Sequence, residues 1–291
     1  KIFGLILSAA VLGTVLTACG GSGAGVSFSG AAGASEPASV SGSAVNSSVY
    51  GTTLADIQAK GELVIGLDDT FAPMGFRDES GNLVGFDIDL ATAVCEELGV
   101  KATFQPIDWD SKELELNSGK IDLIWNGFSI TDERKETMEF TQPYLDNKMI
   151  IIVNEGSDIK TKADLAGKNV GIQDGSSAVD AVEKDDIHNE FASMPTYDTN
   201  ILALSDLEVG RVDAVVADQV VARYYLAQNP DKKFVILDDD FGSEVYGVAA
   251  KKGNTELVDK LQTALDELSE DGTSAEISKK WFGEDIVVHN K

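Results

Sequence analysis

The stretch IDLIWNGFSITDER, residues 121–134, decides the fold of this chain. Its first five residues form a largely apolar run typical of a buried strand, and the residues after Thr131 have the charged pattern of a helix. At such a junction the backbone N–H groups after Gly127 are free, Ser129 offers a hydroxyl, and Arg134 offers a planar fork that matches a carboxylate. The junction therefore suits a small carboxylic acid, most simply an amino acid. In the plainer alternative, Thr131 caps a surface helix and Arg134 pairs with a neighbouring Glu.

Short apolar runs alternate with helical patterns along the rest of the chain, which predicts an α/β fold with mostly parallel sheets. The predicted strands lie at residues 63–67, 102–105, 121–125, 149–153, 169–173, 212–216 and 234–237. Predicted helices include residues 87–98 and 161–166, the second with a capping box formed by Thr161 and Asp164. A second strand-loop-helix corner lies at residues 170–177, and ligands collect at such carboxyl ends of strands. Two corners of this kind predict two lobes that face one cleft.

The N-terminal sequence predicts export from the cytoplasm. The apolar run from Ile2 to Leu16 fits a signal peptide and is short for a membrane span, although a retained anchor is the alternative. The order Leu16-Thr17-Ala18-Cys19 resembles the lipobox of bacterial lipoproteins, which implies that residues 1–18 are a signal peptide and that Cys19 carries lipid. Gly, Ser and Ala dominate residues 19–52, which predicts a flexible tether. We therefore expect a lipid-anchored protein at the extracytoplasmic face of the cell membrane.

Composition argues against several classes of function. The formal net charge of −26 makes nucleic acid and anionic membrane surfaces poor partners. A Gly-x-Ser-x-Gly elbow is absent from the sequence, and His188 and His289 are its only imidazole bases. The acids at 238–240 lack the spacing of a calcium loop, and Cys95, the one cysteine besides Cys19, is expected in the core. The sequence thus predicts a protein that is not an enzyme and uses no metal or cofactor.

Two segments resemble signatures of the polar amino-acid binding proteins of ABC importers, also called solute-binding family 3. They are Gly85-Phe86-Asp87-Ile88-Asp89-Leu90, continued by Val94, Cys95 and Leu98, and Ile130-Thr131-Asp132-Glu133-Arg134. The resemblance extends over residues 63–283. It implies a two-lobed fold of the type II periplasmic-binding-protein class, with lobe 1 at residues 53–144 and 247–291 and lobe 2 at residues 145–246. Two hinge strands would cross near residues 144–148 and 243–247.

The same resemblance implies function and site residues. A monomer would capture a polar amino acid by closure of its lobes and deliver it to a membrane permease. Carried over by motif, Arg134 binds the α-carboxylate, with a backbone N–H from Gly127 and a hydroxyl from Ser129. Asp218 binds the α-ammonium, although without the resemblance it would be taken for a helix cap. The remaining predicted contacts of the carboxylate are Ser176 and Ser177.

Specificity is expected from Asp68, Phe71 and Trp109, which in related proteins give a carboxylate between two aromatic walls. Such a pocket suits an amide, cationic or cystine-like side chain. The alternative is that Asp68 is a solvated loop acid and Trp109 belongs to the core. Asn126 and Gln173 are also expected to line the cleft, and Gln173 stands where Lys or Arg is often found.

Two other functions remain open alternatives at this point. The same bilobal architecture occurs in a dehydratase, so an enzyme on this fold is one of them. A protein that presents its ligand to a sensor is the other. A sensor chain should continue into another membrane segment or a kinase, and no apolar span follows residues 281–283 in this sequence.

Overall fold

A computed structural model describes residues 53–288 of the chain. The predicted signal peptide, the predicted lipidation site Cys19 and the predicted tether at residues 19–52 lie outside the described residues. Between residues 53 and 288, no helix combines the length and the apolar character needed to cross a membrane.

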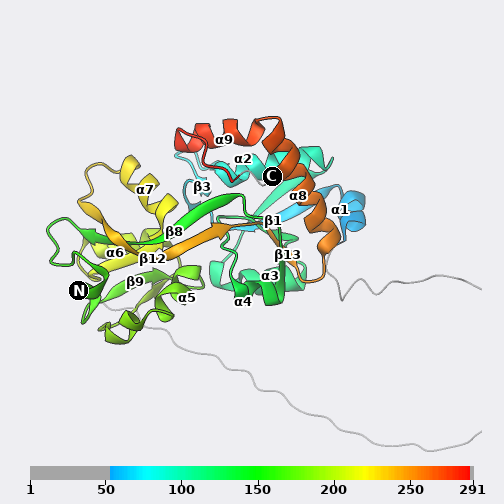
Figure 1. Ribbon diagram of the computed structural model, residues 1–291. Coiled ribbons are helices and arrows are strands. Elements are labelled where there is room, and N and C mark those ends of the chain that lie inside the picture. Colours follow the sequence, from blue (N-terminus) through cyan, green and yellow to red (C-terminus); the bar gives the residue numbers. More distant parts are fainter. Residues whose placement is uncertain (1–52, 289–291) are drawn as a thin grey trace, which may run out of the picture. The chain divides into compact units, whose positions relative to one another are not determined.

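Helices and strands alternate along the described chain, as expected for an α/β fold (Figure 1). The helices are α1 (Leu54–Lys60), α2 (Phe86–Glu97), α3 (Lys112–Ser118), α4 (Asp132–Thr137), α5 (Ser177–Glu183), α6 (Asn200–Glu208), α7 (Gln219–Gln228), α8 (Thr255–Glu270) and α9 (Thr273–Phe282). Short 3-10 helices are η1 (Trp109–Ser111), η2 (Lys162–Leu165) and η3 (Asp186–Glu190).

The first main sheet has five strands in the order β5-β1-β6-β13-β7. Its strands are β1 (Glu62–Leu67), β5 (Lys101–Pro106), β6 (Leu123–Ile124), β7 (Met138–Phe140) and β13 (Ala249–Lys251). β1 pairs in parallel with β5 and β6, whereas β13 is antiparallel to both β6 and β7. A small antiparallel sheet of β2 (Thr70–Phe71), β3 (Gly75–Arg77) and β4 (Leu83–Val84) follows β1 in the chain. Parallel pairing places the carboxyl ends of β1, β5 and β6 at one edge of the sheet.

The second main sheet has five strands in the order β10-β9-β11-β8-β12. Its strands are β8 (Leu145–Asn154), β9 (Val170–Gln173), β10 (Thr196–Tyr197), β11 (Ala214–Asp218) and β12 (Phe234–Tyr246). β9 is parallel to β10 and β11, and β8 is antiparallel to β11 and β12. The ends of β8 and β12 nearest the first sheet pair with each other, with Tyr246 opposite Leu145 and Ser243 opposite Lys148.

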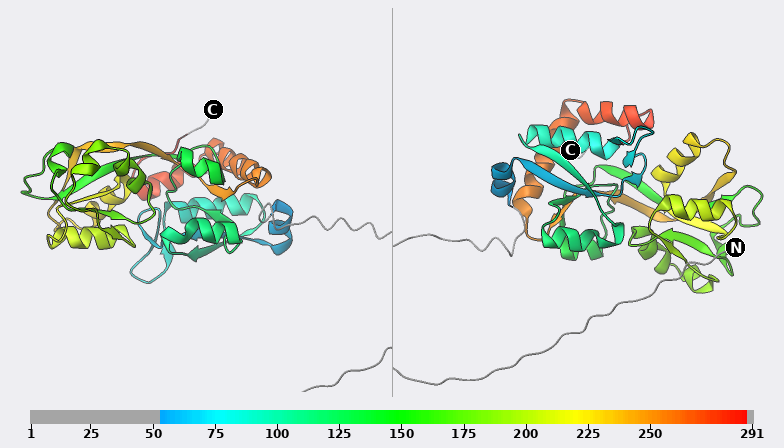
Figure 2. Two further views of the ribbon diagram at one scale, coloured as in Figure 1. Left: turned by 90° about the horizontal axis from the view of Figure 1, so that it is seen from below. Right: turned by 180° about the vertical axis from the view of Figure 1, so that it is seen from behind.

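Each main sheet is covered by helices on both faces (Figures 1 and 2). Apolar side chains of α2 and α8 pack on one face of the first sheet, and Leu116 of α3 packs on the other face. In the second sheet, α5 covers one face through Ala178 and Val182, whereas α6 covers the other through Leu204 and Leu207. Burial on both faces explains why the parallel strands have continuous apolar sequences. Both sheets belong to one compact unit of the chain.

The predicted mixed α/β, two-lobed fold is confirmed, and two element predictions need correction. The strand predicted at residues 234–237 extends to Tyr246, with register shifts on either side of Asp240. Its continuation was missed because three acids follow Leu237 and interrupt the apolar pattern. The helix predicted at residues 161–166 is the 3-10 helix η2, although its predicted capping box of Thr161 and Asp164 is present. The predicted lobe boundaries at residues 144/145 and 246/247 stay predictions.

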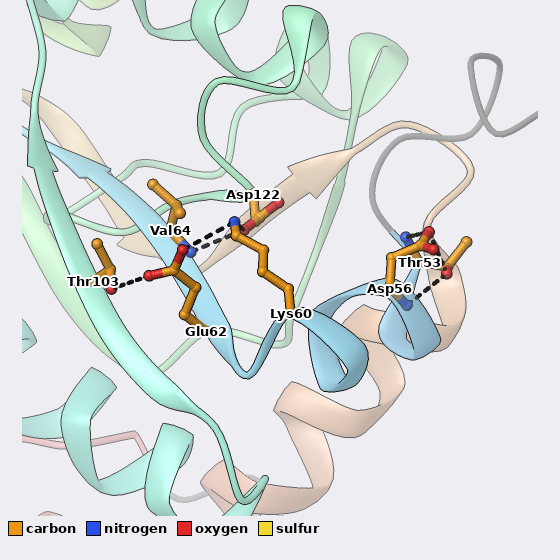
Figure 3. Close-up of polar contacts among 7 residues, drawn as sticks. All are labelled: Thr53, Asp56, Lys60, Glu62, Val64, Thr103 and Asp122. Atoms are coloured by element: carbon orange, nitrogen blue, oxygen red, sulfur yellow. Dashed lines mark hydrogen bonds and ion pairs between the residues drawn. The ribbon is translucent and has the colours of Figure 1, made fainter.

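A buried carboxylate ties the first sheet together where α1 enters it (Figure 3). Asp122 interrupts the apolar run before β6, and its Oδ2 accepts the Val64 N–H of β1 at 2.9 Å and lies 3.4 Å from Lys60 Nζ. Nearby, Glu62 accepts the hydroxyl of Thr103 on β5 at 2.8 Å. Asp122 therefore replaces a missing strand partner with a side-chain acceptor, which explains an acid in a buried segment.

Replacing Asp122 by Ala should lower the free energy of unfolding by about 1–3 kcal/mol, because the Val64 N–H then loses its partner. Chemical denaturation followed by circular dichroism measures this difference. The matched control is Asp231→Ala at an exposed position, which should change stability by less than about 0.5 kcal/mol. Equal effects of the two substitutions would contradict the assigned role of Asp122.

Candidate ligand-binding site

Arg134 lies in a buried position between the two main sheets. Thr131 is the N-cap of α4, and its hydroxyl accepts the Arg134 N–H at 3.2 Å. Arg134 Nη1 donates a hydrogen bond to the Ser129 carbonyl oxygen at 2.9 Å. The central carbon of the guanidinium lies 4.2 Å from the centre of the Phe128 ring. The side chain is only 6% exposed. Thr131 therefore does cap the helix, but Arg134 does not pair with a Glu of its own helix.

The neighbouring Glu133 instead forms an ion pair with Lys184 of the second lobe at 2.7 Å. Burial lowers the pKa of the Arg134 guanidinium, while the carboxylates of Asp180 and Glu244 oppose this effect. An arginine remains charged under such conditions. Arg134 is thus a buried cation held by carbonyl oxygens, which leaves it able to attract a carboxylate.

The expected role of the Gly127 N–H is contradicted by the structure. This N–H donates to Asp87 Oδ2 at 2.7 Å, and the hydroxyl of Tyr144 donates to the same oxygen at 3.1 Å. The sequence prediction failed because the acceptor lies 40 residues earlier, on α2. Gly127 itself is required by its left-handed φ of 54° and by Phe71, which would lie 2.8 Å from an added Cβ. Asp87 on α2 therefore holds the loop at Gly127 in place.

The second predicted corner brings Ser176 and Ser177 to the edge of the second sheet. Ser177 Oγ lies 2.8 Å from Ser129 Oγ of the first lobe, so these two predicted carboxylate contacts meet. Ser176 Oγ donates to the Gln173 carbonyl at 2.8 Å and is engaged within its own loop. Arg134 Nη2 reaches the Gly175 carbonyl in the same loop at 3.3 Å. The two corners therefore contact each other through polar groups.

Asp218 ends β11 and is 4% exposed. Its Oδ1 accepts hydrogen bonds from Asn147 Nδ2 at 2.7 Å and from the Tyr246 hydroxyl at 2.5 Å. Burial raises the pKa of Asp218, and the adjacent Glu244 raises it further. Asp218 is also close enough to Arg134 to act on its charge. The predicted partners for the two charged ends of an amino acid therefore converge on one place.

Asp68 is buried at the opposite end of this cluster, so the alternative of a solvated loop acid is wrong. Its Oδ2 accepts Gln173 Nε2 of the second lobe at 2.9 Å, and its Oδ1 accepts the Thr70 hydroxyl at 2.7 Å. Burial raises its pKa, and these hydrogen bonds work against that shift. Asn126 Oδ1 accepts the Asp68 N–H at 3.0 Å, so this amide positions the end of β1. Asn200 donates to Gln173 Oε1 and fixes the orientation of that amide.

Trp109 and Phe71 are both largely buried beside the corner. Trp109 makes an edge contact with Phe128, with ring centroids 5.7 Å apart, and belongs to the apolar cluster beneath the site. Phe71 packs in the cluster that contains α2 and α8. The alternative that placed Trp109 in the core is therefore supported by its packing, and both rings border the buried polar cluster.

A cavity of about 270 Å³ opens next to Asp68 and Trp109. It is lined by loops from both lobes, and acids predominate among its residues. These are Asp68, Asp69, Thr70, Ile107, Asp108, Trp109, Asp110, Asp174, Asp198 and Thr199. A cavity with this many carboxylates has a negative potential that attracts cations.

Sequence reasoning missed several polar residues that connect the lobes. Lys112 is 4% exposed, and its Nζ donates to the Gly175 carbonyl of the second lobe at 2.7 Å. Burial, followed by the charge of Arg134, lowers the pKa of Lys112 to about 8. Glu244 and Asn147 on the paired strands β12 and β8 were also missed. Their positions follow from strand pairing, and neither belongs to a sequence motif that would have indicated a site.

A metal centre receives no support from the geometry. Between residues 53 and 288, no group of three or more His, Cys, Asp or Glu side chains is arranged to hold a metal ion.

Comparison with known proteins adds to this geometry. Residues 63–284 match the bacterial extracellular solute-binding proteins, family 3. The chain belongs to this family. The L-cystine-binding protein TcyJ of Escherichia coli is 32% identical over 250 residues, which cover 85% of this chain and 92% of that protein. The putative ABC transporter arginine-binding protein 2 of E. coli is 36% identical over 217 residues, covering 73% of this chain and 87% of that protein.

Solved structures agree with the family assignment. A histidine-bound substrate-binding protein of an ABC uptake transporter from Streptococcus pneumoniae is 40% identical, with a TM-score of 0.79. The match covers 82% of this chain and 99% of that one. An ancestral arginine-binding protein bound to arginine is 45% identical, with a TM-score of 0.73 and coverage of 77% and 99%. All four are named as binding proteins.

The buried Asp87 makes stability depend on pH. Burial raises the pKa of Asp87 to about 7, above the value of about 3.9 for an unfolded Asp. The folded state therefore binds more protons between these values, so this group's contribution is fully present below about pH 4 and is lost as pH rises through 7. In Asp87→Asn, the decline in unfolding free energy between pH 5 and 8 should be smaller than in the wild type.

Urea unfolding at each pH measures this difference. The control is Asp231→Asn at an exposed position, which should follow the wild-type pH dependence. A decline in Asp87→Asn as steep as that of the wild type would show that another group is responsible.

Proposed function

We propose that this family member is the extracytoplasmic substrate-binding component of an ABC importer. It captures a polar amino acid by closing two lobes over it and delivers the ligand to a membrane permease. We also propose the anchoring expected from the sequence, with a signal peptide at residues 1–18 and lipid on Cys19, and a monomeric protein. The relatives' named ligands, which include cystine, arginine and histidine, support the class of ligand.

The observation that supports this proposal best is the convergence of Arg134 and Asp218 in one buried polar cluster. One is a cation from the first lobe and the other an acid from the second. Ser129 and Ser177 lie between them and contact each other across the two lobes. In the proposed complex the guanidinium and the two hydroxyls bind the α-carboxylate, and Asp218 binds the α-ammonium. Both ends of the zwitterion thereby receive charge-assisted hydrogen bonds.

The charges at the site favour a ligand with a cationic side chain. The candidate site contains two basic side chains and three acidic ones. The bases are Arg134 and Lys112, and the acids are Asp68, Asp218 and Glu244. A zwitterion with a neutral side chain would leave the acids in excess of the bases, whereas a ligand of net charge +1 would reduce that excess. The acid-lined cavity beside Asp68 supports the same preference. We therefore place arginine and lysine ahead of amide and cystine-like ligands.

Closure in this proposal is controlled by polar contacts between the lobes. The contacts of Lys112 and Arg134 with Gly175, and of Gln173 with Asp68, join groups that belong to different sheets. A ligand that contacts both corners adds differential free energy to the closed form, which is what shifts a two-state equilibrium. A permease that binds the closed form would then preferentially bind protein that carries ligand.

Replacing Arg134 by Ala should weaken binding of L-arginine at least about 100-fold, because the ligand carboxylate would be buried without its cation. Titration calorimetry measures the dissociation constant. The control Arg211→Ala removes a cation whose side chain is 71% exposed and should leave binding within about twofold. Unchanged binding by Arg134→Ala would refute the assignment of the carboxylate site.

A panel of the common amino acids tests the class of ligand. L-Arginine or L-lysine should bind at least about tenfold more tightly than L-glutamine, because a cationic side chain neutralises the charge of the buried Asp68 and an amide does not. In Asp68→Asn this preference should shrink. Tightest binding by L-leucine or L-glutamate would contradict the acidic pocket, and absence of binding by every amino acid would contradict the proposed function itself.

A further inference from the structure

Glu244 occupies a central position that neither the family resemblance nor the sequence motifs assign to the site. It lies on β12 two residues before Tyr246, so strand alternation places both side chains on one face. Directly opposite on β8 is Asn147, its cross-strand partner. Glu244 thus belongs to the paired strands that connect the two sheets.

The contacts of Glu244 reach both lobes. Its Oε1 accepts the hydroxyl of Ser129 and Nδ2 of Asn147, each at 2.7 Å, and its Oε2 lies 2.9 Å from Ser177 Oγ. The same Nδ2 also donates to Asp218 Oδ1 at 2.7 Å. One amide hydrogen-bond donor therefore holds two carboxylates side by side.

This arrangement leaves acceptors in excess of donors. Asn147 Oδ1 is buried and has no hydrogen-bond partner among the described side chains and backbone. An ammonium has three donors and no acceptor, so it complements Asp218, Glu244 and this amide oxygen. Two carboxylates this close resist simultaneous ionisation.

We propose that Glu244 is a second acid of the ammonium site, and that the ligand's α-ammonium replaces one proton that Asp218 and Glu244 hold between them. This inference rests on the proposed function, because it assumes an amino-acid ligand. The exchange conserves charge locally, since one positive charge enters as one proton leaves. A groove of about 710 Å³ is lined in part by Asn147 and Glu244, so Glu244 borders an open space.

Several other charged or titratable groups lie near Asp218 and Glu244. Arg134 on α4 faces both acids and remains charged, and Asp180 on α5 acts on the charges of Arg134, Lys112 and Lys184. The Tyr246 hydroxyl on β12 donates a hydrogen bond to Asp218. Burial, followed by the charges of Asp218 and Glu244, raises the pKa of Tyr246 well above its usual value. Lys148 on β8 pairs with Asp240 instead. Burial and the charge of Glu244 raise the pKa of Asp218, which agrees with a proton held at the pair.

Glu244→Gln tests the first part of this proposal. The substitution preserves size but removes the charge, so binding of L-arginine should weaken at least about tenfold. Binding of 5-guanidinopentanoate, which is arginine without the α-ammonium, should change less than about twofold. The matched control is Asp146→Asn, an exposed acid on the adjacent strand β8, which should leave both dissociation constants unchanged.

Unchanged L-arginine affinity in Glu244→Gln would overturn the assignment. Tighter L-arginine binding would also overturn it, because Glu244 would then compete with the ligand carboxylate for Ser129 and Ser177. Thermal unfolding of the variant without ligand establishes that it is folded. If wild-type protein bound no amino acid, the proposed function would fail instead, so the two failures are distinguishable.

Calorimetry in buffers with different ionisation enthalpies tests the proton exchange. At pH 6–7 the wild type should release a fraction of a proton on binding L-arginine, and Glu244→Gln should release measurably less. Equal proton release by the two proteins would show that the proton comes from another group and would overturn the exchange.

Discussion

The interaction on which this site depends is the burial of Arg134 against carbonyl oxygens. A buried guanidinium is costly unless its hydrogen bonds are satisfied and its charge is balanced. Here the Ser129 carbonyl of one lobe and the Gly175 carbonyl of the other satisfy part of its donors. Among residues 53–288 no acid forms an ion pair with it, and acids such as Asp180 and Glu244 act on its charge from a distance. A carboxylate from outside the protein can therefore improve this balance, which a fully paired arginine would not allow.

Rigid cores beneath the two corners make this arrangement possible. Asp87 fixes the loop at Gly127 from α2, and the Phe128 ring lies under the guanidinium. On the other side, Asn200 orients Gln173, which reaches Asp68. These groups are held by their own lobes, and the contacts that join the two corners are polar. Away from the corners, Val221 and Tyr224 of α7 also pack against apolar side chains of the first lobe. Water can replace polar contacts at modest cost, so the two corners can separate without leaving their polar groups unpaired.

Much of the fold and part of the site could be predicted from sequence, for identifiable reasons. The runs at residues 63–67 and 170–173 became strands because their apolar side chains are buried on both sheet faces. Arg134 and Asp218 follow local strand-loop-helix patterns, so their positions depended on few distant contacts. The Gly127 N–H was misjudged because its partner Asp87 comes from a helix far away in sequence. Glu244 and Asn147 were missed because only the pairing of β8 with β12 brings them together.

The location of Glu244 also explains how a ligand's charge could act on the motion of the lobes. Most contacts of a bound zwitterion belong to one lobe or the other, and they stabilise closure only by bridging the gap. Glu244 and Asn147 differ because they lie on the two strands that connect the lobes. A proton held between Asp218 and Glu244 links the edge of the second sheet to one of these strands, and an ammonium would replace that link with several hydrogen bonds. Occupancy of the ammonium end would then affect the connecting strands directly, whereas Asp68, which lies after β1, would select the side chain without touching them.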